Sequence, residues 1–266
     1  MLELKNIYKT FNPGTINEKR ALNGLNLKLN EGDFVTVIGG NGAGKSTMLN
    51  AVAGTWPVDE GQILIDNIDV TKLSEHKRAT YLGRVFQDPM TGTAATMGIE
   101  ENLALAKRRG KSRLLRSGIT KAEREEYKEL LKILGLGLED RLTSKVGLLS
   151  GRQRQALTLL MATLQKPKLL LLDEHTAALD PKTAAKVLEI TDMIVNRDHL
   201  TTLMITHNMK DAIAHGNRLI MMHEGRVVVD VKGEQKKELT IQSLLELFEK
   251  ASGAEFDDPE ALLTVD

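Results

Sequence analysis

The sequence predicts an α/β protein built on a mostly parallel β-sheet, and three observations indicate this fold class. The apolar run Phe34–Ile38 leads into a glycine-rich turn and then a helical segment, the strand–loop–helix order of a phosphate-binding loop. The four leucines of Leu169–Leu172 form a continuous apolar strand of the kind buried on both faces of a parallel sheet. After residue 164, β-type and helical segments alternate, which favours parallel strands joined by helices.

Composition narrows the class of protein. The 266 residues suffice for one large domain, or for one domain with a subdomain, and the 41% hydrophobic and 27% charged content is ordinary for a globular protein. No stretch approaches the ~20 apolar residues of a membrane span, and we expect no signal peptide. The absence of cysteine excludes disulfides, thiolate zinc sites and cysteine nucleophiles. Lys plus Arg and Asp plus Glu balance at 36 each, so no global field indicates a nucleic-acid partner.

The first part of the chain is predicted to be rich in strands. The alternation of apolar and polar residues from Leu25 to Leu29 is typical of a half-buried strand, and Asn12-Pro13-Gly14-Thr15 is a turn signal. The helix after the glycine-rich turn should end near Gly54. The expected strands are Leu2–Tyr8, Leu25–Leu29, Phe34–Ile38 and Gly61–Ile65.

The middle of the chain, from about Gly98 to Leu164, is predicted to be helical. The pattern Thr120-Lys121-Ala122-Glu123 is a capping box at the head of a helix. Just before it, the run Lys107–Arg116 holds six basic residues and no acid. Such a run can contact lipid head groups or RNA, but a solvated face near a turn between helices is the interpretation that we favour.

The last part of the chain resumes the alternation of strands and helices. Asp180 and Pro181 supply an N-cap and a first-turn proline for a helix that should run to about Asn196. Residues from Glu255 onward are acidic, and we expect them to be loosely ordered. The other expected elements are strands Lys168–Leu172, Leu203–Ile205, Leu219–Met222 and Val227–Val229, and helices Met209–Ala214 and Thr240–Lys250.

The glycine-rich turn has the residues of a phosphate-binding loop. From residue 39 it reads Gly-Gly-Asn-Gly-Ala-Gly-Lys-Ser-Thr, whose glycines let successive N–H groups point at phosphate oxygens. Lys45 can reach the β- and γ-phosphates, and the Ser46 hydroxyl can ligate the Mg²⁺ that bridges them. The sequence therefore predicts a nucleoside triphosphate site that includes Gly39, Asn41, Gly42, Ala43, Gly44, Lys45, Ser46 and Thr47.

Two carboxylates follow the leucine strand. A parallel strand delivers its C-terminal residues to the edge of the sheet where ligands bind. There, Asp173 can hold Mg²⁺ through water, and Glu174 can polarise the water that attacks the γ-phosphate. A core strand that merely ends in surface acids is the alternative, and the upstream phosphate-binding loop argues against it.

A second motif, Leu149-Ser150-Gly151-Arg152-Gln153, precedes the apolar helical stretch Ala156–Leu164. With this motif the sequence resembles the ATP-binding subunits of ABC transporters, which carry Leu-Ser-Gly-Gly-Gln here. In that family the motif closes over the ATP held by the opposite subunit. The resemblance therefore implies that Ser150, Gly151, Arg152 and Gln153 bind nucleotide.

Other family markers match in order, and the resemblance covers residues from about 2 to 229. It implies that Phe11 stacks on adenine, and that Gln87, within Val85-Phe86-Gln87-Asp88-Pro89, contacts Mg²⁺ and senses the membrane partner. Ala178-Leu179-Asp180 fits the family's D-loop at the dimer seam. His207, in Ile205-Thr206-His207, fits the switch histidine that bonds the γ-phosphate.

Three positions depart from the family pattern. Arg152 stands where the family has glycine, His175 stands where proline is usual, and the helix after the motif lacks the arginines common there. Arg152 matters most, because a glycine that faces phosphate generally serves close backbone approach. We expect its side chain to obstruct closure of the dimer or to strain the backbone, although a guanidinium is itself a good phosphate partner.

The resemblance implies a RecA-like core, an antiparallel β-subdomain at the N-terminal side and a helical subdomain at about 88–164. The ATPase domain would span 1–235, followed by a C-terminal helix and acidic tail in 236–266. Two such subunits, as a homodimer, would trap two ATP molecules. Glu174 would be the base, Lys45 and Mg²⁺ would neutralise charge, and His207 would fix the γ-phosphate.

The resemblance also implies partners and a location. Separate membrane permease subunits would dock through the Gln87 region and the helical subdomain, at the cytoplasmic face of the membrane. Uptake with an extracellular binding protein is favoured, and the stretch Leu149–Asp180 looks most like ATPases of putative tryptophan/tyrosine uptake. Two alternatives stay open: a soluble ABC-type ATPase in iron–sulfur cluster building or translation, and a nucleotide-binding module with little turnover because of Arg152.

Overall fold

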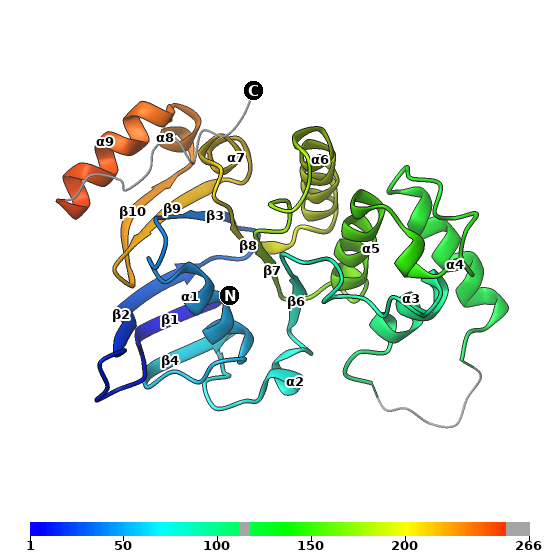
Figure 1. Cartoon of the computed structure of the whole chain (residues 1–266), viewed down its shortest axis with the longest axis horizontal. Coiled ribbons are helices and arrows are strands. Elements are labelled where there is room, and N and C mark those ends of the chain that lie inside the picture. The colour runs from blue at the N-terminus through cyan, green and yellow to red at the C-terminus, as the bar shows by residue number, and fades with distance from the viewer. Residues whose placement is uncertain (112–117, 254–266) are drawn as a thin grey trace.

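Two β-sheets organise the computed structural model, which describes residues 1–111 and 118–253 (Figure 1). One sheet has four strands in the order β2-β1-β4-β5, and the other has six in the order β10-β9-β3-β8-β7-β6. The first is antiparallel throughout. In the second, every pair is parallel except the edge pair of β9 and β10. The predicted α/β class, with a mostly parallel sheet and an antiparallel subdomain, is confirmed.

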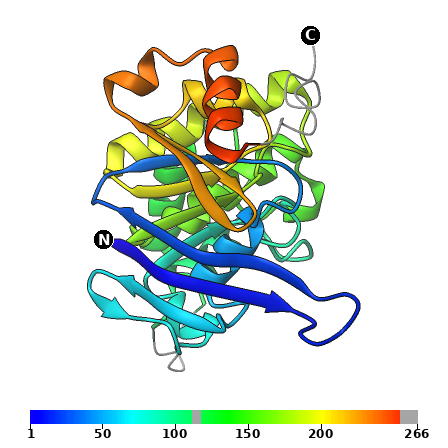
Figure 2. The ribbon, with the colours of Figure 1, turned by 90° about the vertical axis from the view of Figure 1, so that its left-hand side faces the viewer.

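The antiparallel sheet contains β1 (Leu2–Phe11), β2 (Lys19–Leu29), β4 (Glu60–Ile65) and β5 (Ile68–Asp69). In β2, Leu25, Leu27 and Leu29 are buried while the polar residues between them are exposed, as the alternating sequence pattern predicts. The hairpin is longer than expected, since β1 and β2 stay paired as far as Phe11 and Lys19 (Figure 2). These polar ends lack an apolar pattern, and they become strands because their backbone groups pair across the hairpin.

The larger sheet contains β3 (Phe34–Ile38), β6 (Leu82–Val85), β7 (Leu169–Asp173), β8 (Thr201–Ile205), β9 (Arg218–His223) and β10 (Arg226–Lys232). All four leucines of β7 are fully buried, as a strand covered on both faces requires. Sequence reasoning missed β6, which contains a glycine and an arginine and pairs only with β7. Its short mixed sequence resembles a loop until it is placed at the sheet edge.

Helices and the smaller sheet cover the two faces of the larger sheet. Helix α1 (Lys45–Ala53) and the antiparallel sheet pack on one face, where their apolar side chains meet those of β3, β7 and β8. Helices α5 (Gly151–Thr163) and α6 (Pro181–Asp198) pack on the other. Asp180 caps α6 by accepting a hydrogen bond from Thr183 N at 3.1 Å, as expected from the Asp-Pro pair. The short helix α2 (Glu75–Arg78) precedes β6.

The inserted helical part contains α3 (Ile99–Lys107), α4 (Lys121–Lys132) and the short 3₁₀ helix η1 (Val146–Leu148). The capping box at Thr120 and Glu123 is present. The start of the basic run is held by intramolecular contacts, because Lys107 and Arg108 pair with acids of α4. Residues 112–117 of that run lie outside the described part of the chain.

The C-terminal elements pack at the β9–β10 end of the larger sheet. They are α7 (Met209–Ala214), α8 (Glu234–Lys237) and α9 (Ile241–Ser252), which buries Leu244 and Phe248. The acidic tail lies outside the described residues. Among the residues that are described, no helix has both the length and the apolar character needed to cross a membrane.

Candidate functional site

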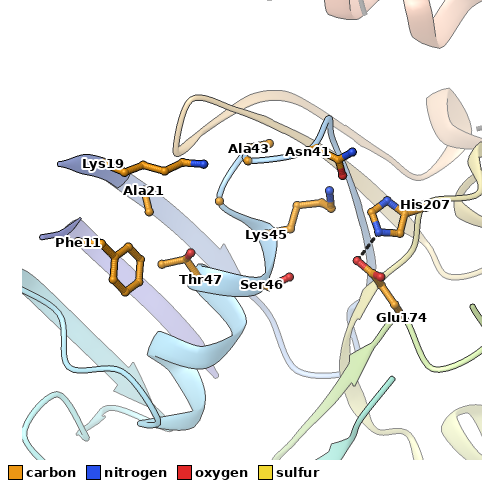
Figure 3. A pocket seen from close by; sticks show the side chains of 12 residues that line it. Phe11, Lys19, Ala21, Asn41, Ala43, Lys45, Ser46, Thr47, Glu174 and His207 are labelled. Atoms are coloured by element: carbon orange, nitrogen blue, oxygen red, sulfur yellow. Dashed lines mark ion pairs between the residues drawn. The ribbon is translucent and has the colours of Figure 1, made fainter. Parts of the chain in front are cut away.

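The carboxyl ends of β3, β7 and β8 meet at one edge of the larger sheet, because parallel strands all end on the same side. A pocket of about 310 Å³ opens there (Figure 3). It gathers ten residues that the sequence predicts as binding or catalytic, together with two that it does not. The lining residues are Phe11, Lys19, Ala21, Asn41, Gly42, Ala43, Gly44, Lys45, Ser46, Thr47, Glu174 and His207.

The phosphate-binding loop has the local geometry of an anion site. Gly44 is the N-cap of α1 and adopts a left-handed φ of 100°, and a Cβ there would lie only 2.5 Å from the Ala21 carbonyl oxygen. No side chain caps this helix, and its first turn holds no acid. The backbone N–H groups at the N-terminus of α1 are therefore available for phosphate oxygens.

Lys45 brings a positive charge into the loop. Its Nζ donates hydrogen bonds to the carbonyl oxygens of Gly39 at 2.7 Å and Gly40 at 3.2 Å, and the residue is only 5% exposed. Burial lowers the pKa of this ammonium, and the charge of Glu174 opposes the shift. The cation is thus held partly desolvated, which favours binding of an anion.

Glu174 and His207 face each other at the ends of β7 and β8. His207 Nε2 lies 2.5 Å from Glu174 Oε1 (Figure 3). Glu174 has a φ of 47°, a left-handed conformation that costs of order 1–3 kcal/mol in a residue with a side chain. Its N–H donates to the Ile205 carbonyl oxygen at 3.1 Å, which ties it to β8. The fold thus holds the carboxylate in a strained but fixed position beside the loop.

Asp173, one residue earlier, is held by a different partner. Its Oδ2 accepts a hydrogen bond from Arg84 Nη2 at 3.2 Å, and the same nitrogen donates to Asn50 Oδ1 of α1 at 2.9 Å. Burial raises the pKa of Asp173, and Arg84 opposes the shift. Asp173 does not line the pocket, and sequence reasoning missed the arginine because it lies in the unrecognised strand β6.

The donor set at this edge fits Mg²⁺, which prefers hard oxygen ligands and keeps several waters. The predicted ligands offer a carboxylate from Asp173, a hydroxyl from Ser46 and an amide oxygen from Gln87. Gln87 lies two residues after the end of β6, and β6 pairs with β7, which ends in Asp173. Gln87 is exposed and does not line the pocket. In residues 1–111 and 118–253, no group of three or more His, Cys, Asp or Glu could hold a metal alone.

The predicted signature residues lie apart from this pocket, at the N-terminus of α5. Ser150 Oγ accepts from Gln153 N at 3.3 Å, and Gln153 Oε1 accepts from Ser150 N at 3.1 Å, so both serve as a capping box. Arg152 is exposed within the first helical turn and has no left-handed φ. The backbone strain expected at this position is therefore absent from the single chain, and only the side chain itself could obstruct a partner.

Two pocket residues escaped sequence reasoning, and both lie on β2. Ala21 places its carbonyl oxygen against Gly44, and Lys19 is paired across the hairpin with Phe11. Their signal is the register of the hairpin, since a residue opposite Phe11 must share its side of the sheet. Phe11 itself packs edge-on against Trp56, with ring centroids 5.1 Å apart.

Fold and site together define a P-loop nucleotide-binding protein, and comparison with known proteins gives the family. The chain belongs to the ABC transporter family, whose model matches residues 22–177. The chain is 46% identical over 252 residues to the tyrosine transport ATP-binding protein of Clostridioides difficile strain R20291, covering 94% of this chain and all of that protein. The chain is therefore the ATP-binding subunit of an ABC transporter, and an ATPase.

Another relative is named as an import protein, and solved structures of cassettes are also similar. The methionine import ATP-binding protein MetN of Bartonella henselae is 34% identical over 86% of this chain, which spans 64% of that protein's length. Among solved structures, the dimeric ATP-binding cassette MJ0796 bound to ADP and Pi is 33% identical, with a TM-score of 0.74 over 87% of this chain and 98% of that one. The cassette MJ1267 in its ADP conformation is 26% identical, with a TM-score of 0.76 over 96% of this chain and 99% of that one.

Proposed function

We propose that the pocket at the end of β3 binds ATP and that Glu174 is the base that activates water for its hydrolysis. One observation carries this proposal: Glu174 and His207, 2.5 Å apart, line the same pocket as Lys45 and the phosphate-binding loop. A carboxylate here can take the proton of an attacking water. Phe11, at the far end of the pocket, offers an aromatic face for adenine.

The chain's own residues divide the work of the reaction. The loop N–H groups and Lys45 hold the β- and γ-phosphates, and the imidazole of His207 binds the γ-phosphate and orients Glu174. The new P–O bond forms to water as the bond to the leaving ADP oxygen breaks, and the water's proton goes to Glu174. Ser46, Gln87 and Asp173 would hold Mg²⁺, which when bound neutralises phosphate charge.

We further propose a homodimer in which the helix α5 N-terminus of one subunit completes the pocket of the other. Ser150, Gly151, Arg152 and Gln153 are all on or beside that N-terminus, away from their own pocket. The dimeric cassette among the similar structures supports this arrangement. In this proposal residues 1–235 form the ATPase domain, with a helical subdomain at about 88–164, and 236–266 form an appended helix and tail.

The transported substrate is proposed to be an amino acid, with tyrosine the first candidate. The support is the 46% identity, over the full length of the relative, to a tyrosine transport ATP-binding protein. The subunit would act at the cytoplasmic face of the membrane, bound to separate permease subunits through the Gln87 loop and the helical subdomain. An extracellular substrate-binding protein would deliver the amino acid to the permease.

Uptake of radiolabelled tyrosine tests the proposal. Cells that lack tyrosine uptake would express permease subunits of an ABC transporter together with either the wild-type chain or the Glu174→Gln variant. We expect uptake with wild type and none with the variant. Uptake of another amino acid alone would correct the substrate. Failure of the chain to copurify with the permease would contradict the proposed contact through the Gln87 loop and the helical subdomain.

A further inference from the structure

We propose that Lys19 is a second phosphate-binding cation of the nucleotide pocket, acting from β2 beside the phosphate-binding loop. The proposal rests on the nucleotide site proposed above and adds a residue to it. Lys45 contacts the loop from within α1, whereas Lys19 approaches from the antiparallel sheet. Both line the pocket.

The register of the hairpin determines where Lys19 points. Lys19 is the cross-strand partner of Phe11, and paired residues of an antiparallel hairpin project from the same side. Figure 3 shows the Lys19 side chain running from β2 toward the loop, while Phe11 lies farther from it. The Lys19 Nζ is 3.0 Å from the point where a Cβ on Gly42 would lie. The ammonium therefore lies beside Gly42 of the phosphate-binding loop.

The charge of Lys19 is available for a ligand. Within residues 1–111 and 118–253, no ion pair involves Lys19. By contrast Lys9, on the adjacent strand, is held at 2.9 Å by Asp59. The polyphosphate of ATP carries about four negative charges near neutral pH, and a lysine ammonium that meets such an oxygen forms a charge-assisted hydrogen bond. Lys19, without an ion pair and beside the phosphate-binding loop, is placed to form that bond.

Contact with phosphate predicts a dependence that contact with base or ribose does not. If Lys19 binds phosphate, its loss weakens the binding of nucleotides whose phosphates reach it and leaves the binding of adenosine unaffected. If Lys19 binds the base or ribose, its loss weakens the binding of adenosine, AMP, ADP and ATP equally. A lysine that is merely solvated affects none of them.

The chain carries its own probe for this experiment. Trp56 is the only tryptophan and packs edge-on against Phe11, so its fluorescence reports on ligands stacked at Phe11, and calorimetry provides the same affinities without an optical probe. Wild type, Lys19→Gln, Lys19→Arg and Arg20→Gln would each be titrated with adenosine, AMP, ADP and ATP. Arg20→Gln is the matched control, because it removes the same charge from the next residue, which is exposed and does not line the pocket.

For Lys19→Gln we expect about a 5–10-fold loss of affinity for ATP and ADP and no change for adenosine. Lys19→Arg should restore most of the loss, and Arg20→Gln should change affinity less than about twofold. Equal ATP affinity in Lys19→Gln and wild type, or an equal loss for adenosine, overturns the proposal.

Lys45→Ala, titrated in parallel, separates this proposal from the nucleotide site on which it rests. If Lys45→Ala binds ATP as tightly as wild type, the pocket itself has been misassigned. If Lys45→Ala loses affinity and Lys19→Gln does not, the pocket stands and only the role of Lys19 is wrong.

Discussion

Two carboxylates, Asp173 at the nucleotide edge and Glu100 in the inserted helices, have pKa values shifted in opposite directions. At the edge, burial pushes pKa values against the charged forms: it lowers that of Lys45 and raises that of Asp173. In the inserted helices, the buried Glu100 has a lowered pKa because Arg124 donates to both of its oxygens, at 2.5 and 2.8 Å. At Lys45 and Asp173 burial is the larger effect on the pKa, whereas at Glu100 the hydrogen bonds from Arg124 are the larger effect.

Backbone conformation differs between Glu174 at the nucleotide edge and the start of helix α4. The strained Glu174 occurs at the nucleotide edge, where it serves a proposed catalytic carboxylate. Helix α4 begins with a complete capping box at Thr120 and Glu123. A left-handed φ also occurs outside the pocket, at Lys166, His199 and Glu224, so Glu174 differs from these residues in its place beside the phosphate-binding loop and not in its conformation alone.

Glu174→Gln should have the largest effect of the changes at the nucleotide edge. The amide keeps the shape of the side chain but cannot take a proton from water, so we expect steady-state ATP hydrolysis to fall about 10²–10⁴-fold. ATP binding should be retained, and size-exclusion chromatography with ATP should show a trapped dimer. Unchanged turnover would show that another group is the base.

His175, which follows Glu174 at the nucleotide edge, should make the unfolding free energy depend on pH. It is 2% exposed, and its Nε2 forms a hydrogen bond with Thr191 Oγ1 at 3.1 Å. Burial lowers the pKa of His175 from 6.5 to about 4. As pH falls below 6.5 the unfolded state binds the proton first, so stability is complete above 6.5 and is lost toward 4. At 1.36 kcal/mol per pKa unit this is at most about 3 kcal/mol.

The measurement is urea unfolding of wild type and His175→Gln between pH 4 and 7. Glutamine keeps a polar partner for Thr191 without titrating, so the variant should lose less stability across this window. His76→Gln, at an exposed position, should follow the wild-type curve. Parallel curves for His175→Gln and wild type would mean that His175 is not buried in the neutral form.

Arg124→Ala tests the ion pair with Glu100 in the inserted helices. It leaves Glu100, whose side chain is 8% exposed, without its charged partner, and we expect a larger loss of unfolding free energy than at a fully exposed ion pair. Because the Glu100 pKa is lowered, its stabilising contribution is present above 4.5 and is lost as pH falls through the folded-state value. Lys128→Ala, which breaks the exposed pair with Glu125, should cost no more than ~0.5 kcal/mol. Nucleotide affinity should be unchanged in both variants.

Arg152→Gly should give the smallest effect. The arginine is exposed and unstrained, so its obstruction would act only when two subunits close. We expect several-fold faster ATP turnover in the glycine variant with little change in single-subunit affinity. Turnover no faster than wild type, measured with and without the permease, would contradict obstruction and favour a guanidinium that binds phosphate across the seam.

The sequence by itself determined the parts of this protein whose chemistry is local. The phosphate-binding loop, the leucine strand with its two carboxylates and the caps of α4 and α6 are readable because glycine, apolar runs and capping side chains act on their nearest neighbours. The order of these motifs along the chain matched that of the family and indicated the role of each. The domain boundaries and the roles of the site residues remain predictions.

Only the tertiary structure decided which distant residues share a site. Lys19 enters the pocket through its pairing with Phe11, and Arg84 reaches Asp173 because the unrecognised strand β6 lies beside β7. It also showed that Arg152 has ordinary helical backbone. The physical reason is that pairing register and burial depend on contacts between segments far apart in the chain, and these set both position and pKa.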